Sequence, residues 1–454
     1  MNLRHLSFPQ APLIKTPPPG PKSRELLDFQ AEYEGSAVSY PRGLPMALQR
    51  GRGATVEDVD GNIYIDFFGG AAVLNVGHSH PDVVAAALAQ VSELTHSLDV
   101  PNPARRALVE RLLSLLPDPL HKVFFGGPTG SDAVESAVKL AKFNTKRYPL
   151  IAFSGGYHGM SAGALSLCSG LSFKEDFLPL IAEVHFCPYA YCYRCPFQKK
   201  PESCNLECAH YLEVVLTDPH SGVGRPAAII VEAIQGEGGS VVPPEDFIAF
   251  IRELCHKLEI ILIIDEIQTG FGRTGKMFAF QHSGIIPDIV TFSKALGGLG
   301  FPISCIAYRK ELDTLPPGKH IGTFRGNVVA YAAGRAALDF ITDKNLPGHA
   351  QQLGGRVIEE LKSLEKDSKS VGDIRGAGLM LGVEFVLDRS SKKPAPEVAR
   401  KVRSLCHKRG LLIEIGGHYF NVARFLPPLV LTEDLADEGV RIFKEAVKEA
   451  EDSL

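Results

Sequence analysis

The chain has 454 residues, with 48 lysines and arginines against 52 aspartates and glutamates, so its formal net charge is −4. Hydrophobic residues make up 45% and charged residues 22% of the sequence, a balance that excludes a disordered, collagen-like or coiled-coil chain. The slightly acidic, scattered charge argues against a nucleic-acid partner. The longest apolar runs, such as 259–265, are far shorter than the ~20 residues of a membrane-spanning helix, so we expect no membrane partner.

The N-terminal segment is proline-rich as far as Pro21 and lacks the apolar stretch of a secretory signal. Nine cysteines in a chain of this length, without such a signal, are typical of reduced thiols. We therefore expect a cytoplasmic protein. The segment to about Ser23 is expected to lie as an arm on the surface or on a partner subunit.

The predicted elements begin with a hairpin around Asp60-Gly61, the strongest short turn signal available. From there to about residue 310, short apolar runs alternate with helical patterns. Nearly continuous apolar runs predict strands buried on both faces at 150–153, 228–231, 260–264, 289–292 and 304–307. This alternation predicts an α/β fold with a mostly parallel central sheet covered by helices.

The pattern changes after about Ala330. A long helical stretch towards Lys362 precedes a predicted strand at 379–385, a helix at 396–408, strands at 411–415 and 422–425, and a closing helix after Thr432. These elements predict a smaller α+β domain. We place an N-terminal arm with part of the small domain at 1–55, the large domain at 56–335 and the C-terminal small domain at 336–454.

Charged side chains directly follow two predicted strands. Asp265 follows the aliphatic run 260–264, where burial disfavours the charge unless a cation lies opposite; a helix cap or a satisfied structural carboxylate is the alternative. Lys294 follows 289–292 and precedes glycines. A lysine there can act as a Schiff-base nucleophile, although most lysines are merely solvated. Ligands of open α/β sheets bind at the carboxyl ends of strands, so we expect both residues beside a ligand.

Two glycine-rich turns add to this pattern. Segment 126–133 lies between a strand and a helix, so its backbone N–H groups and the hydroxyls of Thr129 and Ser131 suit a phosphate, unless it is a plain tight loop. Tyr157, in 154–159, offers a flat face for stacking on a ring, or else a turn aromatic that seals the core. A phosphate cradle, a stacking face, a carboxylate and a lysine together predict a site for pyridoxal 5′-phosphate.

These residues lie in motifs through which the sequence resembles the class III (ornithine/4-aminobutyrate type) aminotransferases, over roughly residues 40–445. The motifs are 75–81, 129–135, 157–159, 231–239, 265–275, 293–294, 322–327 and 424–428. The resemblance implies the aspartate aminotransferase fold (PLP fold type I) and a transaminase that uses pyridoxal 5′-phosphate. A non-enzymatic scaffold is disfavoured because both Lys294 and Asp265 are present.

The resemblance also implies roles for single residues around the cofactor ring. Lys294 would form the Schiff base and later move the proton of the substrate, while Asp265 would keep the pyridine nitrogen protonated. Gln268 would bond the phenolic oxygen of the ring. Tyr157 would stack on one face, and His158 belongs to the same cofactor-binding segment.

The phosphate of the cofactor would be held by Thr129, Gly130 and Ser131, with Thr323 contributed by the other subunit. Because one site then uses two chains, the resemblance implies a homodimer at least. Whether dimers pair into tetramers stays open.

The substrate residues implied by the resemblance are Arg424 and Glu237, and Glu232 is implied as a catalytic residue beside Lys294 and Asp265. The planar fork of Arg424 suits the carboxylate of 2-oxoglutarate. Glu237 would pair with this arginine when the donor presents a distal amine and would swing away for a dicarboxylate. Glu232 would join the hydrogen-bond network of the site. This pattern favours a donor with a distal amine and 2-oxoglutarate as acceptor, giving glutamate.

Two local sequence features indicate the class of amino donor. Arg325, where many relatives have glycine, and segment 193–197 resemble the diaminobutyrate–2-oxoglutarate aminotransferases. The donor can then be diaminobutyrate-like, ornithine-like or 4-aminobutyrate-like. The alternative function is an amino-acid racemase or epimerase on the same fold, which needs neither Arg424 nor Glu237 for a keto-acid acceptor.

A cysteine cluster remains outside this function. Cys192, Cys195, Cys204 and Cys208 have the spacing C-x2-C-x8-C-x3-C, with Cys187 and two histidines nearby. Such spacing can make a structural zinc site. The aminotransferase core needs none, and reduced cysteines are common buried residues, so we assign no metal and leave both interpretations open.

Overall fold

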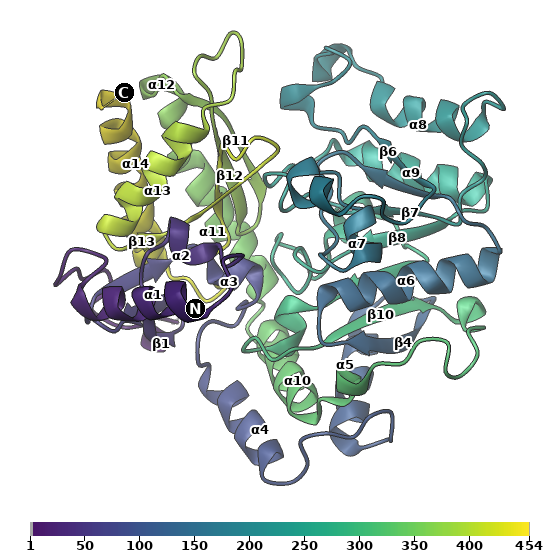
Figure 1. The fold of residues 1–454 in the computed structure, drawn as a ribbon, viewed down its shortest axis with the longest axis horizontal. Helices are drawn as coiled ribbons and strands as arrows, with labels where there is room; N and C mark the ends of the chain where they lie inside the picture. The colour runs from purple at the N-terminus through teal and green to yellow at the C-terminus, as the bar shows by residue number, and fades with distance from the viewer. Residues whose placement is uncertain (1–2, 454) are drawn as a thin grey trace.

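The computed structural model describes residues 3–453, which form two lobes (Figure 1). One lobe is built from the middle of the chain around a seven-stranded sheet. The other lobe brings the purple N-terminal and the yellow C-terminal segments together around two four-stranded sheets. No helix within residues 3–453 is both long enough and apolar enough to cross a lipid bilayer.

The large sheet has the strand order β4-β10-β9-β8-β7-β5-β6. Its strands are β4 (Leu120–Gly127), β5 (Leu150–Phe153), β6 (Val184–Cys187), β7 (Ala228–Val231), β8 (Ile261–Asp265), β9 (Ile289–Phe292) and β10 (Ser304–Arg309). The ladders from β6 to β9 are parallel, and β10 runs antiparallel to both β9 and β4. The mostly parallel sheet predicted from the apolar runs is therefore confirmed, and β6 is a strand that the runs did not indicate.

Helices cover this sheet with their apolar faces. Helix α6 (Gly130–Thr145) packs on β4, β9 and β10 and buries Val134, Ala137 and Ala141. These side chains meet the sheet because small and apolar residues recur on one face of the helix. The other helices of this lobe are α4 (Pro81–Val91), α5 (Pro103–Leu115), α7 (Ala162–Ser166), α8 (Glu207–Thr217), α9 (Glu245–Lys257) and α10 (Val328–Asp343). The inner strands β5, β7, β8 and β9 are buried along their whole length, whereas the edge strands β4 and β6 are partly exposed.

The second lobe contains segments from both ends of the chain. One sheet, β1-β2-β3-β13, combines β1 (Leu48–Arg52), β2 (Thr55–Asp58) and β3 (Ile63–Asp66) with β13 (Leu411–Leu412), which pairs in parallel with β3. The other sheet, β11-β12-β15-β14, contains β11 (Val371–Ala377), β12 (Met380–Phe385), β14 (Glu414–Gly416) and β15 (Val422–Phe425). Its helices are α1 (Pro21–Tyr33), α2 (Tyr40–Gly43), α3 (Gly69–Ala72), α11 (Leu346–Leu361), α12 (Leu364–Asp367), α13 (Pro396–Lys408) and α14 (Glu433–Asp452).

The predicted domain boundaries fall within regular elements. The boundary after residue 55 lies in β2, and the boundary after residue 335 lies in α10. The predicted N-terminal arm packs on its own chain, because Phe8 donates its N–H to the Thr55 hydroxyl and Leu13 bridges Ile63.

The long helical stretch predicted towards Lys362 is interrupted between α10 and α11. Asn345 adopts a left-handed backbone there, with φ of 46°, and its side chain accepts a hydrogen bond from the Gly348 N–H. An asparagine tolerates this conformation and caps a new helix. One predicted helix is therefore two.

Candidate active site

The carboxylate of Asp265 lies at the end of β8, at the carboxyl edge of the large sheet. Its Oδ1 accepts hydrogen bonds from the Thr291 hydroxyl (2.9 Å) and from the Ile267 N–H (3.0 Å). Only 4% of the residue is exposed, so these bonds fix the carboxylate in one orientation. Its position beside β9 follows from the parallel register, which pairs Asp265 with Thr291.

His158 occupies the other oxygen of this carboxylate. Its Nδ1 lies 2.7 Å from Asp265 Oδ2, and the imidazole is buried. Burial by itself would lower the pKa of His158, but the hydrogen bond and charge of Asp265 outweigh it and raise this pKa. The resemblance placed His158 in the cofactor-binding segment. In the fold it orients Asp265, a role that only the contact between two distant segments reveals.

Lys294 begins the turn η7 (Lys294–Gly297) directly after β9. Its φ of 44° is in the left-handed region, a strained backbone that concentrates at functional sites. Burial lowers the pKa of Lys294, although the charges of Asp265 and Glu237 act against the shift. The structure thus brings the predicted lysine and carboxylate to one place and favours a less protonated, more nucleophilic amine.

The predicted phosphate cradle lies at the N-terminus of α6. Thr129 is the N-cap residue, and its N–H and hydroxyl both donate to Asp132 Oδ2 at 2.9 and 2.6 Å. The hydroxyl of Ser131 accepts the Met160 N–H at 3.1 Å. Gly159 has a φ of 128°, which L side chains rarely adopt, and a Cβ there would lie 2.1 Å from this hydroxyl and 3.1 Å from Ser131 Cα. The free N–H groups of a helix's first turn and its dipole suit an anion.

Gln268 and Glu232 are two further predicted residues of the site, and both are held by nearby backbone groups. The buried Gln268 Oε1 has no hydrogen-bond partner in residues 3–453, although buried polar atoms normally have one. Glu232 accepts the Tyr157 N–H at 3.1 Å and the Gly236 N–H at 2.8 Å. Burial raises the pKa of Glu232 to about 7. The unsatisfied oxygen and the held Tyr157 backbone fit a polar ring bound here, as pyridoxal phosphate would be.

Arg424, on β15, and Glu237 form an ion pair. Arg424 Nη2 lies 2.8 Å from Glu237 Oε2, and Nη1 lies 3.3 Å from the Gly236 carbonyl oxygen. The arginine side chain is 3% exposed and that of Glu237 is 29% exposed. The buried Arg424 Nε has no partner among residues 3–453. A buried cation is therefore paired with a carboxylate whose side chain is partly exposed to solvent.

Two further residues need separate description. Thr323 lies exposed in the turn η9 (Thr323–Gly326) and makes no hydrogen bond to the other predicted cofactor residues in 3–453, so its role in a partner's site stays a prediction. Tyr40, which no motif indicated, lies near Glu237 and Arg424; partial burial and nearby carboxylates raise its pKa. Its helix α2 comes from the distant N-terminal segment, so no local signal could reveal it.

The sequence is similar to those of known enzymes along almost its whole length. The chain is 42% identical over 437 residues to the diaminobutyrate–2-oxoglutarate aminotransferase of Haemophilus influenzae, covering 94% of this chain and 96% of that protein. It is also 36% identical over 445 residues to an alanine/serine racemase of Pyrococcus horikoshii, covering 96% and 93%. Both similarities span nearly the whole of each chain.

A solved structure shares the fold. The crystal structure of an amine transaminase from an uncultivated Pseudomonas species, in its PLP-bound form, superposes with a TM-score of 0.83 at 30% identity, covering 92% of this chain and 98% of that one. The family model described as "Aminotransferase class-III" matches residues 37–447. The predicted fold type, enzyme class and cofactor, pyridoxal 5′-phosphate, are thereby confirmed. The chain belongs to the class-III aminotransferase family.

Proposed function

We propose that the protein transfers an amino group from an amino acid with a distal amine to 2-oxoglutarate, which gives glutamate. The observation that carries this proposal is the Arg424–Glu237 ion pair. The buried guanidinium can bind a carboxylate of 2-oxoglutarate once Glu237 swings out. When Glu237 covers the arginine, the same pocket instead offers a carboxylate for a donor's distal ammonium group.

The residues around the cofactor position have separate tasks. Bound pyridoxal phosphate supplies an electron-accepting ring. The chain holds a negative charge at Asp265 Oδ2, fixed by His158, where the ring nitrogen would keep its proton. Lys294 Nζ, with its lowered pKa, takes up and returns the proton of the substrate. Thr129, Gly130 and Ser131 would hold the phosphate at the N-terminus of α6.

We favour a diaminobutyrate-like donor. The Haemophilus relative carries that substrate in its name. The Arg325 side chain, which marks the resemblance to such enzymes, is ordered by its bonds to the His320 carbonyl (2.6 Å) and to the Asp99 carboxylate. A donor panel of diaminobutyrate, ornithine, lysine, 4-aminobutyrate and branched-chain amino acids, read by glutamate formed, tests this. The proposal fails if only branched-chain donors are used.

The second candidate is an amino-acid racemase, because a relative of that name is 36% identical over most of the chain. A racemase returns the proton to the α-carbon and needs no acceptor. The test is optical rotation of a single amino acid with no keto acid present. We expect no change for the transaminase, and sustained racemisation would favour the alternative.

We also propose a homodimer. Exposed apolar side chains gather where the segment before Asn102 meets η9: Ser97 donates its N–H to the Gly326 carbonyl at 3.0 Å, and Leu98, Ile321 and Phe324 are 49%, 74% and 71% exposed. Such a surface suits association. Light scattering of the purified protein tests the dimer, and a monomer would refute it. The cytoplasmic location and the possible tetramer stay predictions.

A further inference from the structure

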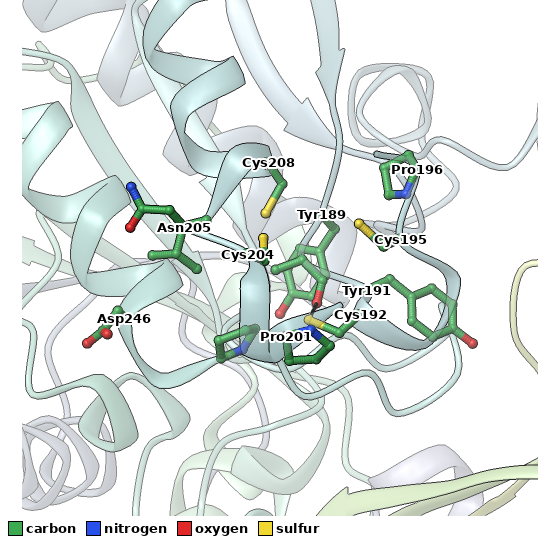
Figure 2. A pocket seen from close by; sticks show the side chains of 13 residues that line it. Tyr189, Tyr191, Cys192, Cys195, Pro196, Pro201, Cys204, Asn205, Cys208 and Asp246 are labelled. Atoms are coloured by element: carbon green, nitrogen blue, oxygen red, sulfur yellow. Dashed lines mark hydrogen bonds between the residues drawn. The ribbon is translucent and has the colours of Figure 1, made fainter. Parts of the chain in front are cut away.

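The four cysteines of the C-x2-C-x8-C-x3-C pattern surround one cavity outside the active site. Cys192, Cys195, Cys204 and Cys208 all line a space of about 290 Å³, and Figure 2 shows the side chains of Cys204 and Cys208 pointing towards each other beside the other two. None of the residues assigned above to the cofactor or the substrate lines this space. Cys187 does not line it either, so the fold selects four of the nine thiols.

Local structure presents these cysteines as two pairs. Cys192 begins the short turn η4 (Cys192–Arg194), and Cys195 follows that turn directly. Cys204 ends the turn η5 (Pro201–Ser203), and Cys208 lies in the first turn of α8. The first pair therefore lies on one tight turn and the second pair spans the junction of η5 and α8, and paired short-spaced cysteines of this kind can chelate one metal ion.

We propose that the four thiols bind a single structural zinc ion. Zinc has no preferred geometry of its own and is held by four thiolates in closed structural sites. Soft sulfur ligands also disfavour magnesium and calcium, which take oxygen ligands. With all four positions filled by protein, the ion has no open place for substrate. It acts on the fold, not on the amino transfer.

Zinc binding has to tighten the two turns around the ion. No three histidine, cysteine, aspartate or glutamate side chains of residues 3–453 already form a metal-ligand set, and Cys204 Sγ instead donates a hydrogen bond to Glu207 Oε2 at 2.8 Å. The four thiols are four of the thirteen residues that line the cavity, and as they stand they do not form a ligand set for one ion. Because metal binding and local folding are coupled in such sites, loading should make segment 192–208 more resistant to protease.

Residues in and beside the turn η4 also contact the other lobe. Arg194 Nε lies 2.5 Å from Glu384 Oε1, and the Tyr191 hydroxyl donates to the same carboxylate. Glu384 lies on β12 and is fully buried. A zinc ion that fixes Cys192 and Cys195 therefore also fixes two of the residues through which the large lobe contacts β12.

The experiment is metal analysis of the holoenzyme, purified without a histidine tag and dialysed against metal-free buffer. We expect about one zinc per chain, falling at least about tenfold in Cys204→Ser and Cys208→Ser. Cys187→Ala is the matched control, since this buried cysteine belongs to the same region but does not line the cavity, and it should keep its zinc. Native protein without zinc, or with iron in its place, would overturn the proposal.

A second measurement does not depend on the variants. Native protein stripped of zinc and given Co²⁺ should show the visible ligand-field absorption of a tetrahedral cobalt thiolate, and limited proteolysis within 192–208 should slow down on loading. Absence of the cobalt absorption would refute the site. Zinc content does not depend on the amino donor, so neither outcome bears on the proposed function.

Discussion

Replacement of Arg424 by alanine should impair the two half-reactions unequally. The guanidinium is fixed by β15 and points its Nη atoms towards Glu237 and the Gly236 carbonyl, so it can give a dicarboxylate two parallel hydrogen bonds. Each charge-assisted bond contributes about 1.5 kcal/mol, and two contribute about 3 kcal/mol. This corresponds to a fall of about 100-fold in kcat/KM for 2-oxoglutarate. The donor half-reaction should lose much less, because a distal ammonium is bound by Glu237.

Single-turnover kinetics of each half-reaction, followed by the absorbance of the cofactor, separate these effects. Arg424→Lys is the matched control: it keeps the charge but loses the planar fork, so its acceptor defect should be intermediate. Thermal unfolding of all three proteins checks that the lobe stays folded. Equal losses in both half-reactions, or an unchanged acceptor half-reaction, would refute the gate formed by Arg424 and Glu237.

Three further predictions concern other parts of the structure. Lys294→Ala should lower turnover at least about a thousandfold with an unchanged circular dichroism spectrum, and normal turnover would contradict its role. Burial raises the pKa of Glu232 to about 7 from an ordinary value of 4.5, so the folded state binds the proton more tightly and stability falls as pH rises through this range. Relative to native protein, Glu232→Gln should therefore gain up to about 3 kcal/mol between pH 5 and 8, measured as Tm against pH, and a constant difference in Tm would argue against it. Glu384→Ala leaves Arg194 and Arg375 without their buried partner. It should lower the free energy of unfolding in urea by about 3–5 kcal/mol, more than Glu384→Gln does. An unchanged unfolding midpoint would show that this network does not stabilise the fold.

Much of the site could be predicted because its residues are adjacent in sequence to strands and turns. Asp265 and Lys294 each follow an apolar run, and parallel strands place their carboxyl ends at one edge of a sheet. Thr129 and Ser131 stand at a strand-to-helix turn, where the N-terminus of a helix binds anions. Element types at these places follow from local periodicity, so the chain alone indicates both the fold class and the cofactor.

Periodicity does not report strand direction or lobe membership. The run 304–307 is as continuously apolar as the runs that form the parallel strands, yet β10 pairs antiparallel with both of its neighbours. The pairing of β13 with β3 joins residues about 350 positions apart. A single left-handed residue, Asn345, divides a helix that the apolar pattern continues through.

What the sequence by itself determined is the set of chemical groups and their place at strand ends and turns, because those depend on neighbours along the chain. Only the tertiary structure decided which groups meet. It brought His158 within hydrogen-bond distance of Asp265 and placed Glu237 in an ion pair with Arg424. It also placed four of the nine cysteines in the lining of one cavity. The first two contacts join segments that are distant in sequence, whose approach is fixed by the burial of apolar surface across the whole fold and not by any local pattern. The cysteines lie within one short segment, so their spacing already indicated the group and the fold added the cavity that they line.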